Sequence, residues 1–600
     1  MAATKEKPTP SLVTAVGTLR RLKLLVWVSE RVRPTDLQIT LVWAGLIGCA
    51  GALSSIAFRY VTGVVHHLIT GSGGPGLVES FSHLSPTARV ITPAAGGLAA
   101  GWIMWLGGRW RSQTTTTTDY MEAVVLGDGK ISATRSLVKC ASALFTIASG
   151  GSIGREGPLV QLSSLLASLA GRWRKWSIPR LRLLVGCGAA AGIASAYNAP
   201  IAGALFVAEI VLGSVAMEIF GPLVFSSVIA TLTVRAFGGG DPLYRIPPFR
   251  MHGNWEIVPY LFLGIAAALV APWFIRLLRA SERAAGRVRL PVYLKMCLGG
   301  LIVGTLAVFH PEVCGNGYSA VNSILRGEWI WQTLAVILIF KIVATTATFG
   351  SGAVGGVFTP TLFIGASLGF LFGNGLQGCH FAVDPSAFAL VGMGAFLAAA
   401  THAPLMAIIM IFELTLDYQI ILPLMLASVV AYYTSAGIEK HSIYAEALKR
   451  KGAGDYRRQL TELHVRDLMK TAPLTVSTRA PFAEIAESFI ATRFNYLYVT
   501  EGQRFIGAVS LHDIKNYLNV PELAKVVIAG DLLRTPFPTV HPEFTLREAL
   551  EQFRGHDGNR LPVVQSAEPM SLLGSISKTD VILALAGEIG SPTSIDFPAQ

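Results

Sequence analysis

The sequence GCGAAAGIASAYNAPIAGALFVAE, at residues 186–209, recurs in outline as GMGAFLAAATHAPLMAIIMIFE at residues 392–413. Both copies begin with G-x-G-A, continue through small residues to Ala-Pro, and close with an apolar run and a glutamate. The Ala-Pro pairs lie 204 residues apart, and so do the closing glutamates, Glu209 and Glu413. A shared order with a constant offset indicates that the chain contains two homologous halves.

A second matched pair lies upstream in each half. GREGP at residues 154–158 corresponds to GVFTP at residues 356–360, at an offset of 202. Gly-rich backbone makes a poor helix interior, whereas a proline soon after a glycine cluster is typical of the first turn of a helix. We therefore expect a broken helix at each place, in halves that span about residues 90–235 and 295–438. Close helix packing through small residues would explain the alanine-rich runs, but it leaves the two prolines unexplained.

The distribution of charge indicates a membrane domain followed by a soluble one. Only 14% of the residues are charged and 52% are hydrophobic, against about 25% charged residues in ordinary soluble domains. Residues 183–208, 342–383, 385–412 and 418–438 contain no Asp, Glu, Lys or Arg. A bilayer is spanned by about 20 apolar residues, so we expect the first 440 residues to form a polytopic membrane domain. The remainder carries ordinary charge and is expected to be soluble.

The formal charge of +12 has two interpretations, a nucleic-acid partner or orientation in a membrane. Basic residues that flank membrane spans stay on the cytoplasmic side. We therefore expect cytoplasmic N- and C-termini, no nucleic-acid partner and, without a recognisable cleavable signal, a multi-pass protein of a bacterial inner membrane. The six cysteines form no CxxC pair, which predicts buried thiols rather than disulfides or a metal site. The basic residues next to the first and last apolar stretches are Arg20, Arg21, Lys23, Arg31, Arg33, Lys440, Lys449, Arg450 and Lys451.

Glu156 lies inside the first break. An acidic residue at membrane depth is costly and usually functional, and helix N-termini stabilise negative charge. A carboxylate at such a terminus competes with a permeating anion, and it opens the site when it swings away or takes up a proton. The alternative is a structural ion pair between Arg155 and Glu156 at a loop. The residues alone favour neither interpretation.

At these segments the chain resembles the CLC family of chloride channels and chloride/proton antiporters. GREGP at residues 154–158 is similar to the family's G-[KR]-E-G-P signature, and GVFTP at residues 356–360 is similar to its G-x-F-x-P signature. SIY at residues 442–444 is similar to the segment that carries the family's central-site tyrosine. The order, spacing and duplication extend the resemblance over about residues 37–450.

The resemblance implies a fold and a set of site residues. The fold is an all-α polytopic membrane domain of two inverted repeats with broken helices, and the assembly is a homodimer in the lipid bilayer with one pore in each subunit. Glu156 is implied as the gate and proton acceptor, with chloride as the substrate and no cofactor required. The backbone N–H groups of Val357 and Phe358 and the hydroxyl of Tyr444 are implied as chloride ligands. The selectivity segments comprise Gly154, Arg155, Gly157, Pro158, Gly356, Thr359 and Pro360.

One position that departs from the family pattern concerns the anion. The family's first signature, G-S-G-I-P, falls on Thr114–Thr118, which are five consecutive threonines. Thr115 then replaces the serine that contacts chloride, and it keeps a hydroxyl donor while adding a methyl group and a stiffer rotamer. An alignment shifted by one or two residues would instead make this run an N-cap cluster. The sequence therefore leaves the anion selectivity open.

A second departure concerns protons. Antiporters of the family usually carry an inner glutamate, and the residue aligned with it here is Ile210. Isoleucine cannot carry a proton, so the sequence leaves both a passive channel and a chloride/proton antiporter open. Glu209 is adjacent, but one residue turns a side chain by about 100° around a helix. Its match with Glu413 predicts a structural role for both glutamates.

The soluble tail contains its own repeat. Residues 465–489 match residues 529–553 at an offset of 64, and IGAVSLHD at 506–513 matches LGSISKTD at 573–580. The pattern resembles a pair of CBS domains, an α/β fold whose pairs often bind adenine nucleotides, so ATP, ADP or AMP is a candidate ligand. As an alternative, the serine of each S/T-x-x-D element caps the helix that follows. The elements that the resemblance implies for the ribose are Ser510–Asp513 and Ser577–Asp580.

These observations predict a function and a domain order. The expected function is transmembrane chloride transport through a glutamate-gated pathway, regulated by the CBS pair. An enzyme is not expected, since the sequence contains no HExxH and no paired His/Asp constellation. A proton-coupled antiporter is the main alternative, and a membrane sensor acting through the CBS pair is a remote one. The expected domains are an N-terminal segment 1–36, a membrane domain 37–450, a linker 451–462, CBS domains 463–520 and 527–588, and a tail 589–600.

Overall fold

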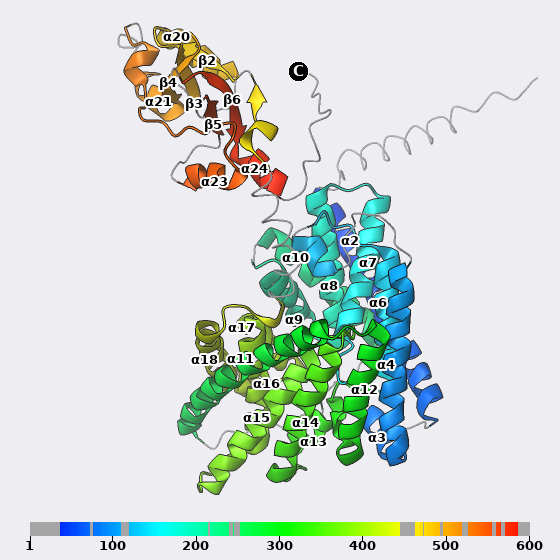
Figure 1. The fold of residues 1–600 in the computed structure, drawn as a ribbon. Coiled ribbons are helices and arrows are strands. Elements are labelled where there is room, and N and C mark those ends of the chain that lie inside the picture. Colours follow the sequence, from blue (N-terminus) through cyan, green and yellow to red (C-terminus); the bar gives the residue numbers. More distant parts are fainter. Residues whose placement is uncertain are drawn as a thin grey trace, which may run out of the picture. The chain divides into compact units, whose positions relative to one another are not determined.

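The chain folds into two units, Met1–Glu446 and Ala447–Gln600 (Figure 1). A predicted cluster of site residues, the threonines at 114–118 with Thr115 among them, lies outside the described residues. The described part of the first unit is helical, whereas the second unit combines helices with two small sheets. The computed structural model describes residues 36–71, 76–109, 119–125, 127–213, 217–238, 244, 253–444, 463–471, 473–491, 496–518, 526–554, 560–565 and 570–585.

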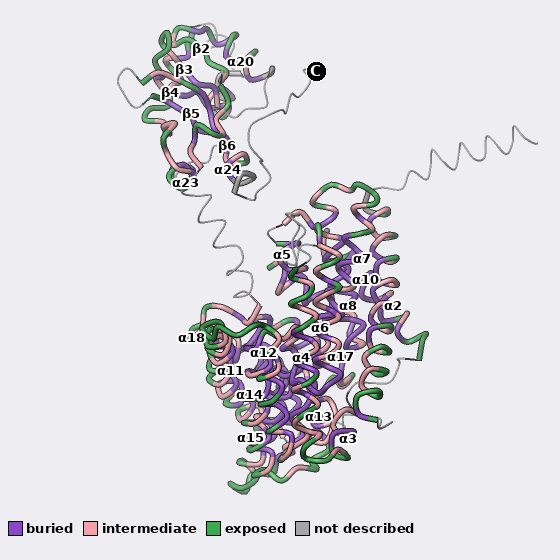
Figure 2. Tube along the Cα trace, turned by 45° about the vertical axis from the view of Figure 1, so that its right-hand side comes forward, coloured by how far each residue is buried: buried purple, intermediate pink, exposed green. Residues whose placement is uncertain are grey.

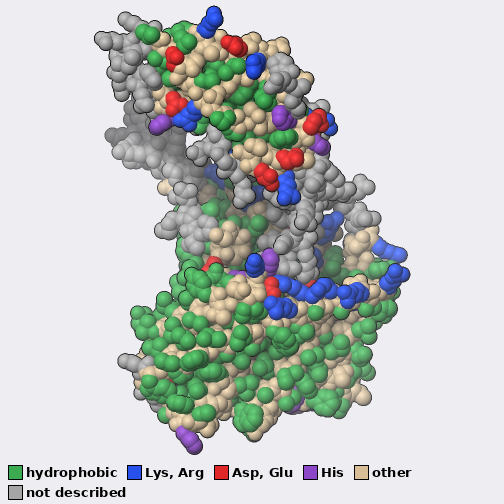
Figure 3. Space-filling model, turned by 60° about the vertical axis from the view of Figure 1, so that its left-hand side comes forward, with side chains coloured by type: hydrophobic (Ala, Val, Ile, Leu, Met, Phe, Trp, Pro, Cys, Tyr) green, Lys and Arg blue, Asp and Glu red, His purple; other side chains and the backbone are tan. Residues whose placement is uncertain are grey.

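The first unit consists of two successive sets of helices. By length and composition, eight helices of the described residues could cross a membrane. Figure 3 shows one face of this unit, on which hydrophobic side chains cover a broad area and a row of lysine and arginine side chains borders it. The elements up to residue 236 are α2 (Asp36–Thr70), α3 (Leu77–Ser82), α4 (Pro86–Arg109), α5 (Tyr120–Val125), α6 (Ala133–Ala148), α7 (Glu156–Trp173), α8 (Ile178–Tyr197), α9 (Pro200–Leu205), the π-helix η1 (Phe206–Val211) and α10 (Met217–Ala236). The later elements are η2 (Asn254–Glu256), α11 (Ile257–Arg287), α12 (Val292–Phe309), η3 (Pro311–Val313), α13 (Tyr318–Leu325), α14 (Trp331–Gly350), α15 (Phe358–Gly378), α16 (Pro385–Thr401), α17 (Pro404–Thr415), η4 (Tyr418–Ile420) and α18 (Ile421–Ile438).

The two predicted helix breaks are present at the matched segments. Helix α6 ends at Ala148 and α7 begins at Glu156, while α14 ends at Gly350 and α15 begins at Phe358. The proline of each segment is the third residue of the helix that follows, as expected for a first-turn proline. Each half therefore presents a helix N-terminus inside the membrane unit.

The two halves also share an unusual backbone conformation at their Ala-Pro pairs. The residues that cap the C-termini of α8 and α16 are Asn198 and His402, and both are left-handed, with φ of 59° and 58°. Asn and His are among the side chains that adopt this conformation more readily than most. In each half, the Ala-Pro pair follows directly and opens the next helix, α9 or α17. The repeat is therefore one of conformation as well as of sequence.

Helices α8 and α16 form the interior of the membrane unit. Every residue of 186–197 and of 386–401 is buried, and Figure 2 shows buried residues concentrated along α7 and α8. Helix α7 packs on α8, and α15 packs on α16. The second contact needs glycines, because a Cβ at either Gly365 or Gly392 would lie 2.5 Å from the carbonyl oxygen of the other. Small residues thus hold the two broken helices close to the central pair.

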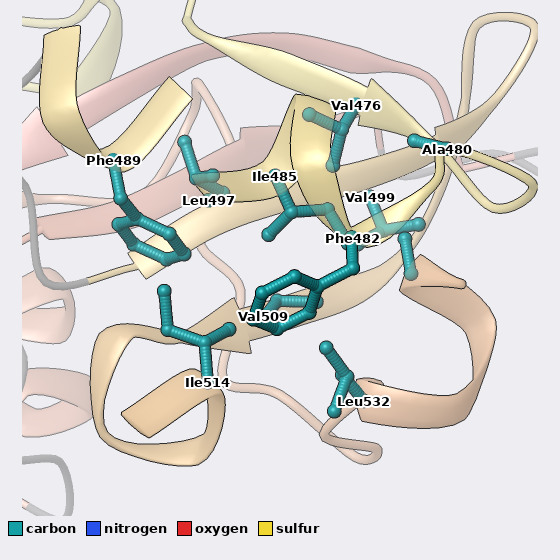
Figure 4. Close-up of a cluster of buried hydrophobic side chains, with 11 residues drawn as sticks. Val476, Ala480, Phe482, Ile485, Phe489, Leu497, Val499, Val509, Ile514 and Leu532 are labelled. Carbon is teal, nitrogen blue, oxygen red and sulfur yellow. The ribbon is translucent and has the colours of Figure 1, made fainter. Parts of the chain in front are cut away.

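The second unit contains two three-stranded sheets, in the orders β2-β3-β4 and β1-β6-β5. Strand β2 pairs parallel with β3, whereas β1, from the first repeat, pairs antiparallel with β6 of the second. One core lies between α20 and the first sheet, around Phe482, Ile485 and Leu497 (Figure 4). The second repeat has a core of its own, around Leu546 and Phe553. The elements are η5 (Val465–Asp467), β1 (Lys470–Thr471), β2 (Thr475–Ser477), α20 (Phe482–Ala491), β3 (Tyr496–Glu501), β4 (Arg504–Ser510), α21 (Leu511–Leu518), η6 (Ala529–Leu532), α23 (Leu546–Arg554), β5 (Arg560–Val564), β6 (Leu572–Ser577) and α24 (Lys578–Leu585).

Candidate functional site

The two broken segments of the membrane unit meet each other. The N–H of Gly154 donates to the carbonyl of Gly356 over 2.7 Å, and the N–H of Gly356 donates to the carbonyl of Gly154 over 2.9 Å. These glycines are the matched first residues of the two G-x-x-x-P segments, and they form an isolated antiparallel bridge. The bridge therefore joins the two halves and brings the starts of α7 and α15 together.

Glu156, the first residue of α7, lies with its carboxylate at the start of α15. The residue is 2% exposed. Its Oε1 accepts a hydrogen bond of 2.7 Å from the backbone N–H of Thr359, one from the Thr359 hydroxyl, and one of 2.5 Å from the hydroxyl of Tyr197. Its Oε2 has no hydrogen-bond partner among the described residues. The carboxylate thus occupies a helix N-terminus, which is the kind of place where proteins bind anions.

The predicted chloride ligands Val357 and Phe358 lie at this same helix terminus. Val357 is the N-cap residue of α15 and Phe358 is its first residue, and both are buried. The first N–H groups of a helix have no partner within it, and they form the positive end of the helix dipole. The structure therefore brings Val357, Phe358 and Glu156 together, as the family resemblance implies.

Arg155 faces an aromatic ring rather than the carboxylate beside it. Its guanidinium carbon lies 5.0 Å from the ring centroid of Tyr318, in a cation–π arrangement. The Nε of Arg155 has no hydrogen-bond partner among the described residues. This geometry disfavours the structural Arg155–Glu156 ion pair that the sequence left open.

Tyr444 is linked to the break by a series of aromatic rings. The ring centroids of Tyr444 and Phe206 are 5.7 Å apart, and those of Phe206 and Phe358 are 6.4 Å apart. The series continues from Phe358 to Tyr197 over 5.0 Å. Tyr444 therefore belongs to the same cluster of side chains as Phe358 and as Tyr197, the hydrogen-bond partner of Glu156.

Glu209 and Glu413 have a structural role, as the sequence predicts, and each binds the start of a helix in the opposite half. The carboxylate of Glu413 accepts hydrogen bonds from the N–H groups of Ile201 and Ala202, over 2.9 and 2.8 Å, at the start of α9. Glu209 makes the equivalent pair of bonds, over 3.3 and 2.8 Å, to the start of α17. Each glutamate thus caps a helix of the other half. Ile210 lies next to Glu209 within η1.

Sequence reasoning misses the hydroxyl of Tyr197. Tyr197 ends a run of small residues, and the sequence assigns it no role. One signal points to it: Tyr197 aligns with Thr401 at the offset of 204, so each half carries a hydroxyl directly before its left-handed residue. The side chain of Thr359, expected only as part of a selectivity segment, is the second contributor that the sequence does not single out.

The serines of the predicted nucleotide elements in the second unit act as helix caps. The Oγ of Ser510 accepts a hydrogen bond from the N–H of His512 over 3.1 Å. The Oγ of Ser577 accepts one from the N–H of Asp580 over 2.9 Å. These contacts are those of the capping alternative.

The aspartates of the two elements differ in their ionic partners. The guanidinium of Arg534 donates to both oxygens of Asp513, over 2.6 and 2.7 Å. The Nζ of Lys470 lies 3.7 Å from Asp580. Hydrogen bonding from Arg534 lowers the pKa of Asp513 below its ordinary value of 3.8. A ribose at Asp513 must therefore displace a charge-assisted, bidentate partner.

Comparison with known proteins identifies the family. Residues 96–436 match the sequence profile described as "Voltage gated chloride channel", and residues 465–520 and 529–587 each match the CBS domain profile. A ClcB-like chloride channel protein of Ralstonia nicotianae is 51% identical over 413 residues, which make up 68% of this chain and 96% of that protein. The chain therefore belongs to the CLC, or voltage-gated chloride channel, family, and it carries two CBS domains.

Two solved structures are similar to the chain in fold. The X-ray structure of a slow cyanobacterial Cl⁻/H⁺ antiporter has a TM-score of 0.60 at 25% identity, and the match covers 69% of this chain and 97% of that one. The crystal structure of a eukaryotic CLC transporter has a TM-score of 0.59 at 17% identity and covers 90% of this chain and 97% of that one. The predicted fold class, a helical membrane domain followed by an α/β CBS pair, is thereby confirmed.

Proposed function

We propose that this protein is a transporter rather than an enzyme, and that it moves chloride along a pathway between its two halves with Glu156 as the gate. The observation that supports this is the carboxylate of Glu156 at the N-terminus of α15, where it accepts the N–H of Thr359. In this position it excludes an anion from the N–H groups of Val357 and Phe358. The gate is closed in this arrangement.

Opening requires the carboxylate to leave the helix terminus or to lose its charge. A protonated glutamate gains less from the helix dipole than an ionised one, so acid favours opening. Chloride then takes the place at α15, with the hydroxyl of Tyr444 as a further ligand. Such divided, weak binding by dipoles and hydroxyls allows fast release.

Chloride efflux from liposomes tests this proposal. The Glu156→Ala variant is expected to raise efflux at neutral pH and to remove its dependence on external pH. Glu79→Ala, on the exposed surface of α3, serves as the matched control and is expected to leave both unchanged. A folded wild-type protein without chloride efflux would contradict the proposal and would favour a membrane sensor acting through the CBS pair.

A second candidate is exchange of chloride for protons. It is supported by the fold shared with a structure described as a Cl⁻/H⁺ antiporter and by a protonatable glutamate in the pathway. Ile210, which cannot carry a proton, favours a passive channel instead. A chloride gradient imposed on vesicles whose internal pH is recorded distinguishes the two. Uphill proton movement would exclude the passive channel, and chloride flux without proton movement would exclude the antiporter. Under exchange, Glu156→Ala is expected to abolish the proton signal.

We propose that the protein works as a homodimer in a bacterial inner membrane, with both termini cytoplasmic. The family resemblance and the bacterial source of a relative that is 51% identical support this proposal. Light scattering of the purified protein, corrected for detergent, is expected to give twice the 64.0 kDa mass of the chain. Protease added to intact cells is expected to leave both termini uncut. A monomeric mass or cleavage from outside would contradict the respective part.

We propose that the CBS pair regulates the flux and that an adenine nucleotide is its ligand. Asp580 is the better candidate for the ribose, because its cationic neighbour lies 3.7 Å away, whereas Asp513 holds Arg534 at 2.6 Å. Titration with ATP, ADP and AMP is expected to show binding that Asp580→Asn weakens more than Asp513→Asn does. Deletion of the residues after about 460 that leaves flux regulation unchanged would exclude the regulatory role.

A further inference from the structure

The chain between α18 and Tyr444 has no regular secondary structure. Helix α18 ends at Ile438, and residues 439–442 form neither helix nor strand. Backbone groups in such a segment need hydrogen-bond partners from elsewhere in the fold. Tyr444, the chloride ligand that the resemblance implies, follows two residues later. The position of its hydroxyl in the pathway therefore depends on what holds this segment in place.

Two arginines of α11 hold the segment at Glu439, its first residue. Arg276 donates through Nε to Oε2 of Glu439, and Arg279 donates through Nη1 to Oε1, both over 3.1 Å. Each arginine also donates through Nη2 to a backbone carbonyl, Arg276 to that of Ile438 over 3.2 Å and Arg279 to that of His441 over 3.1 Å. The two guanidinium groups thus bind both the side chain and the backbone of the segment.

Helix α11 is a firm base for these contacts. Its two arginines are three residues apart, so they lie on the same face of the helix. The helix packs against α16 and α18, and a Cβ at Gly264 would lie 2.6 Å from the carbonyl oxygen of Ala427 in α18. The ring centroids of Phe274 and of Phe396 in α16 are 6.2 Å apart. Because close-packed interiors transmit displacements, the arginines attach the segment to the central helices.

The first half has different chemistry at the equivalent position. At the offset of 204, Glu439 corresponds to Arg235, and His402 corresponds to Asn198. Arg235 donates to Oδ1 of Asn198 over 3.0 Å, which is a contact within its own half. Glu439 is bound by α11 instead. The acidic residue therefore occurs in the half whose chain continues to the predicted chloride ligand.

We propose that the two arginines are positioning residues of chloride transport: by holding Glu439 and the carbonyls beside it, they fix the hydroxyl of Tyr444 in the pathway. The proposal rests on the role of Tyr444 as a chloride ligand, stated above. The ring of Tyr444 packs against Phe206, with centroids 5.7 Å apart, so the side chain is held by η1 and the backbone before it is held by α11. Without the arginines, this backbone is released and the hydroxyl leaves the anion.

Breaking the pair of Arg279 and Glu439 is expected to have the largest effect. These two side chains are 19% and 11% exposed, whereas that of Arg276 is 57% exposed. A largely buried charge that loses its partner is costly, so the segment is expected to leave its position. We expect chloride binding to weaken about fivefold in Arg279→Gln and in Glu439→Gln, and about twofold in Arg276→Gln.

The experiment measures chloride binding to the full-length protein by calorimetry, for each variant alone and combined with Tyr444→Phe. If the arginines act through the hydroxyl of Tyr444, they affect binding only while that hydroxyl is present. The combined variants are then expected to bind chloride as Tyr444→Phe alone does. A merely structural role would weaken binding by the same factor in both backgrounds.

Two further measurements accompany the calorimetry. Hydrogen exchange of residues 438–444 is expected to be faster in Arg279→Gln and in Glu439→Gln than in the wild type. Glu439→Asp, which keeps the charge, is expected to bind chloride more tightly than Glu439→Gln does. Arg283→Gln is the matched control, because the Nε of Arg283 donates to a carbonyl of its own helix, and it is expected to change neither binding nor exchange.

Three outcomes overturn the proposal. The first is equal weakening with tyrosine and with phenylalanine at position 444, and the second is an equal change in Arg283→Gln. The third is unchanged binding in Arg279→Gln and Glu439→Gln although Tyr444→Phe weakens it. If Tyr444→Phe itself leaves binding unchanged, the ligand role fails and the positioning role falls with it, whereas the proposed gate has its own test. Should Arg279→Gln not fold, Arg279→Lys carries the test, since lysine keeps the charge but has one nitrogen in place of the two that bind Glu439 and the backbone.

Discussion

The two broken segments of the membrane unit have the same backbone and opposite chemistry. In each, a glycine opens the segment and a proline lies in the first turn of the next helix, and the two glycines, Gly154 and Gly356, pair with each other. At the equivalent position the first half has Glu156 and the second has Phe358. One segment thus supplies a negative charge, and the other supplies the helix terminus that receives it. The halves match where the chain must bend and differ at the position of the proposed gate.

The glutamates that follow the Ala-Pro pairs, in contrast, are equivalent in the two halves. Glu209 and Glu413 each accept two backbone N–H groups at the start of a helix in the opposite half. Here both the position and the chemistry are equivalent. A residue whose carboxylate joins the halves is therefore the same in both, whereas the proposed gate, Glu156, is present in one half alone.

The largest effect is expected from removing the charge that makes the broken segments differ. Glu156→Gln keeps the shape of the side chain but removes the charge-assisted hydrogen bonds at α15, so efflux at pH 7.5 is expected to rise at least about tenfold. The matched change, Phe358→Leu, keeps the backbone N–H and is expected to alter efflux by less than about threefold. Liposome efflux of both variants measures this, and equal effects would show that the two segments are not functionally distinct.

A several-fold effect is expected from the paired glycines. A Cβ at Gly154 would collide with the carboxylate of Glu156, and one at Gly356 would lie 2.7 Å from its Oε2. Both Gly154→Ala and Gly356→Ala are thus expected to push the carboxylate out and raise efflux, the first more than the second. Gly63→Ala, where a Cβ meets nothing within 4 Å, is the control. Efflux below the wild-type level in both variants would contradict this.

A smaller effect, equal in the two halves, is expected at the helix caps formed by Glu209 and Glu413. Glu209→Gln and Glu413→Gln each replace charged acceptors with a neutral one, which is expected to cost about 1–2 kcal/mol. The unfolding temperature of the protein in detergent is then expected to fall by about 1–3 °C in both. A fall in one variant more than twice that in the other would break the equivalence of the two caps.

The smallest effect is expected at the aspartates of the CBS repeats. The pKa of Asp513 is lowered by Arg534, so the pair stabilises the unit above the ordinary pKa and loses this contribution as pH falls below about 4. Because Arg534 is largely exposed, the contribution is less than about 1 kcal/mol. Hydrogen exchange of peptides covering β4 and η6 at pH 6 and 3.5, corrected for intrinsic rates, is expected to show the loss in the wild type and not in Asp513→Asn. Asp580→Asn, with its longer ion pair, is the matched comparison and is expected to change less.

The sequence predicts those parts of the site that depend on the backbone. The breaks before Glu156 and Phe358 follow from glycine and proline, which restrict the chain wherever they stand. The duplication of the membrane halves and the internal repeat of the soluble tail also follow from spacing, whereas the CBS fold of that repeat is implied by the resemblance. Contact between Glu156 and α15 is implied by the family resemblance.

The remaining parts depend on distances across the fold. Spacing predicts a structural role for Glu209 and Glu413, but it cannot tell which half each carboxylate contacts. Nothing in the alanine-rich run around Tyr197 points to a polar contact of its side chain. The contact of its hydroxyl with Glu156 depends on how α8 is placed in the fold. Likewise, the S/T-x-x-D element suggests that Asp513 is a ligand for a ribose. Its ionic partner Arg534 is 21 residues away in the sequence, so the element alone does not reveal the ion pair.

The cap that Glu413 forms on α9 also determines when, during synthesis, that helix can be completed. The carboxylate that completes the N-terminus of α9 belongs to Glu413, 212 residues after Ile201. At typical elongation rates, the ribosome needs about 10–40 s to reach it. During that interval the first half holds uncovered N–H groups in or near the bilayer, where unsatisfied backbone is costly. The N-terminus of α9 can therefore reach its final hydrogen bonding only after the second half has been made.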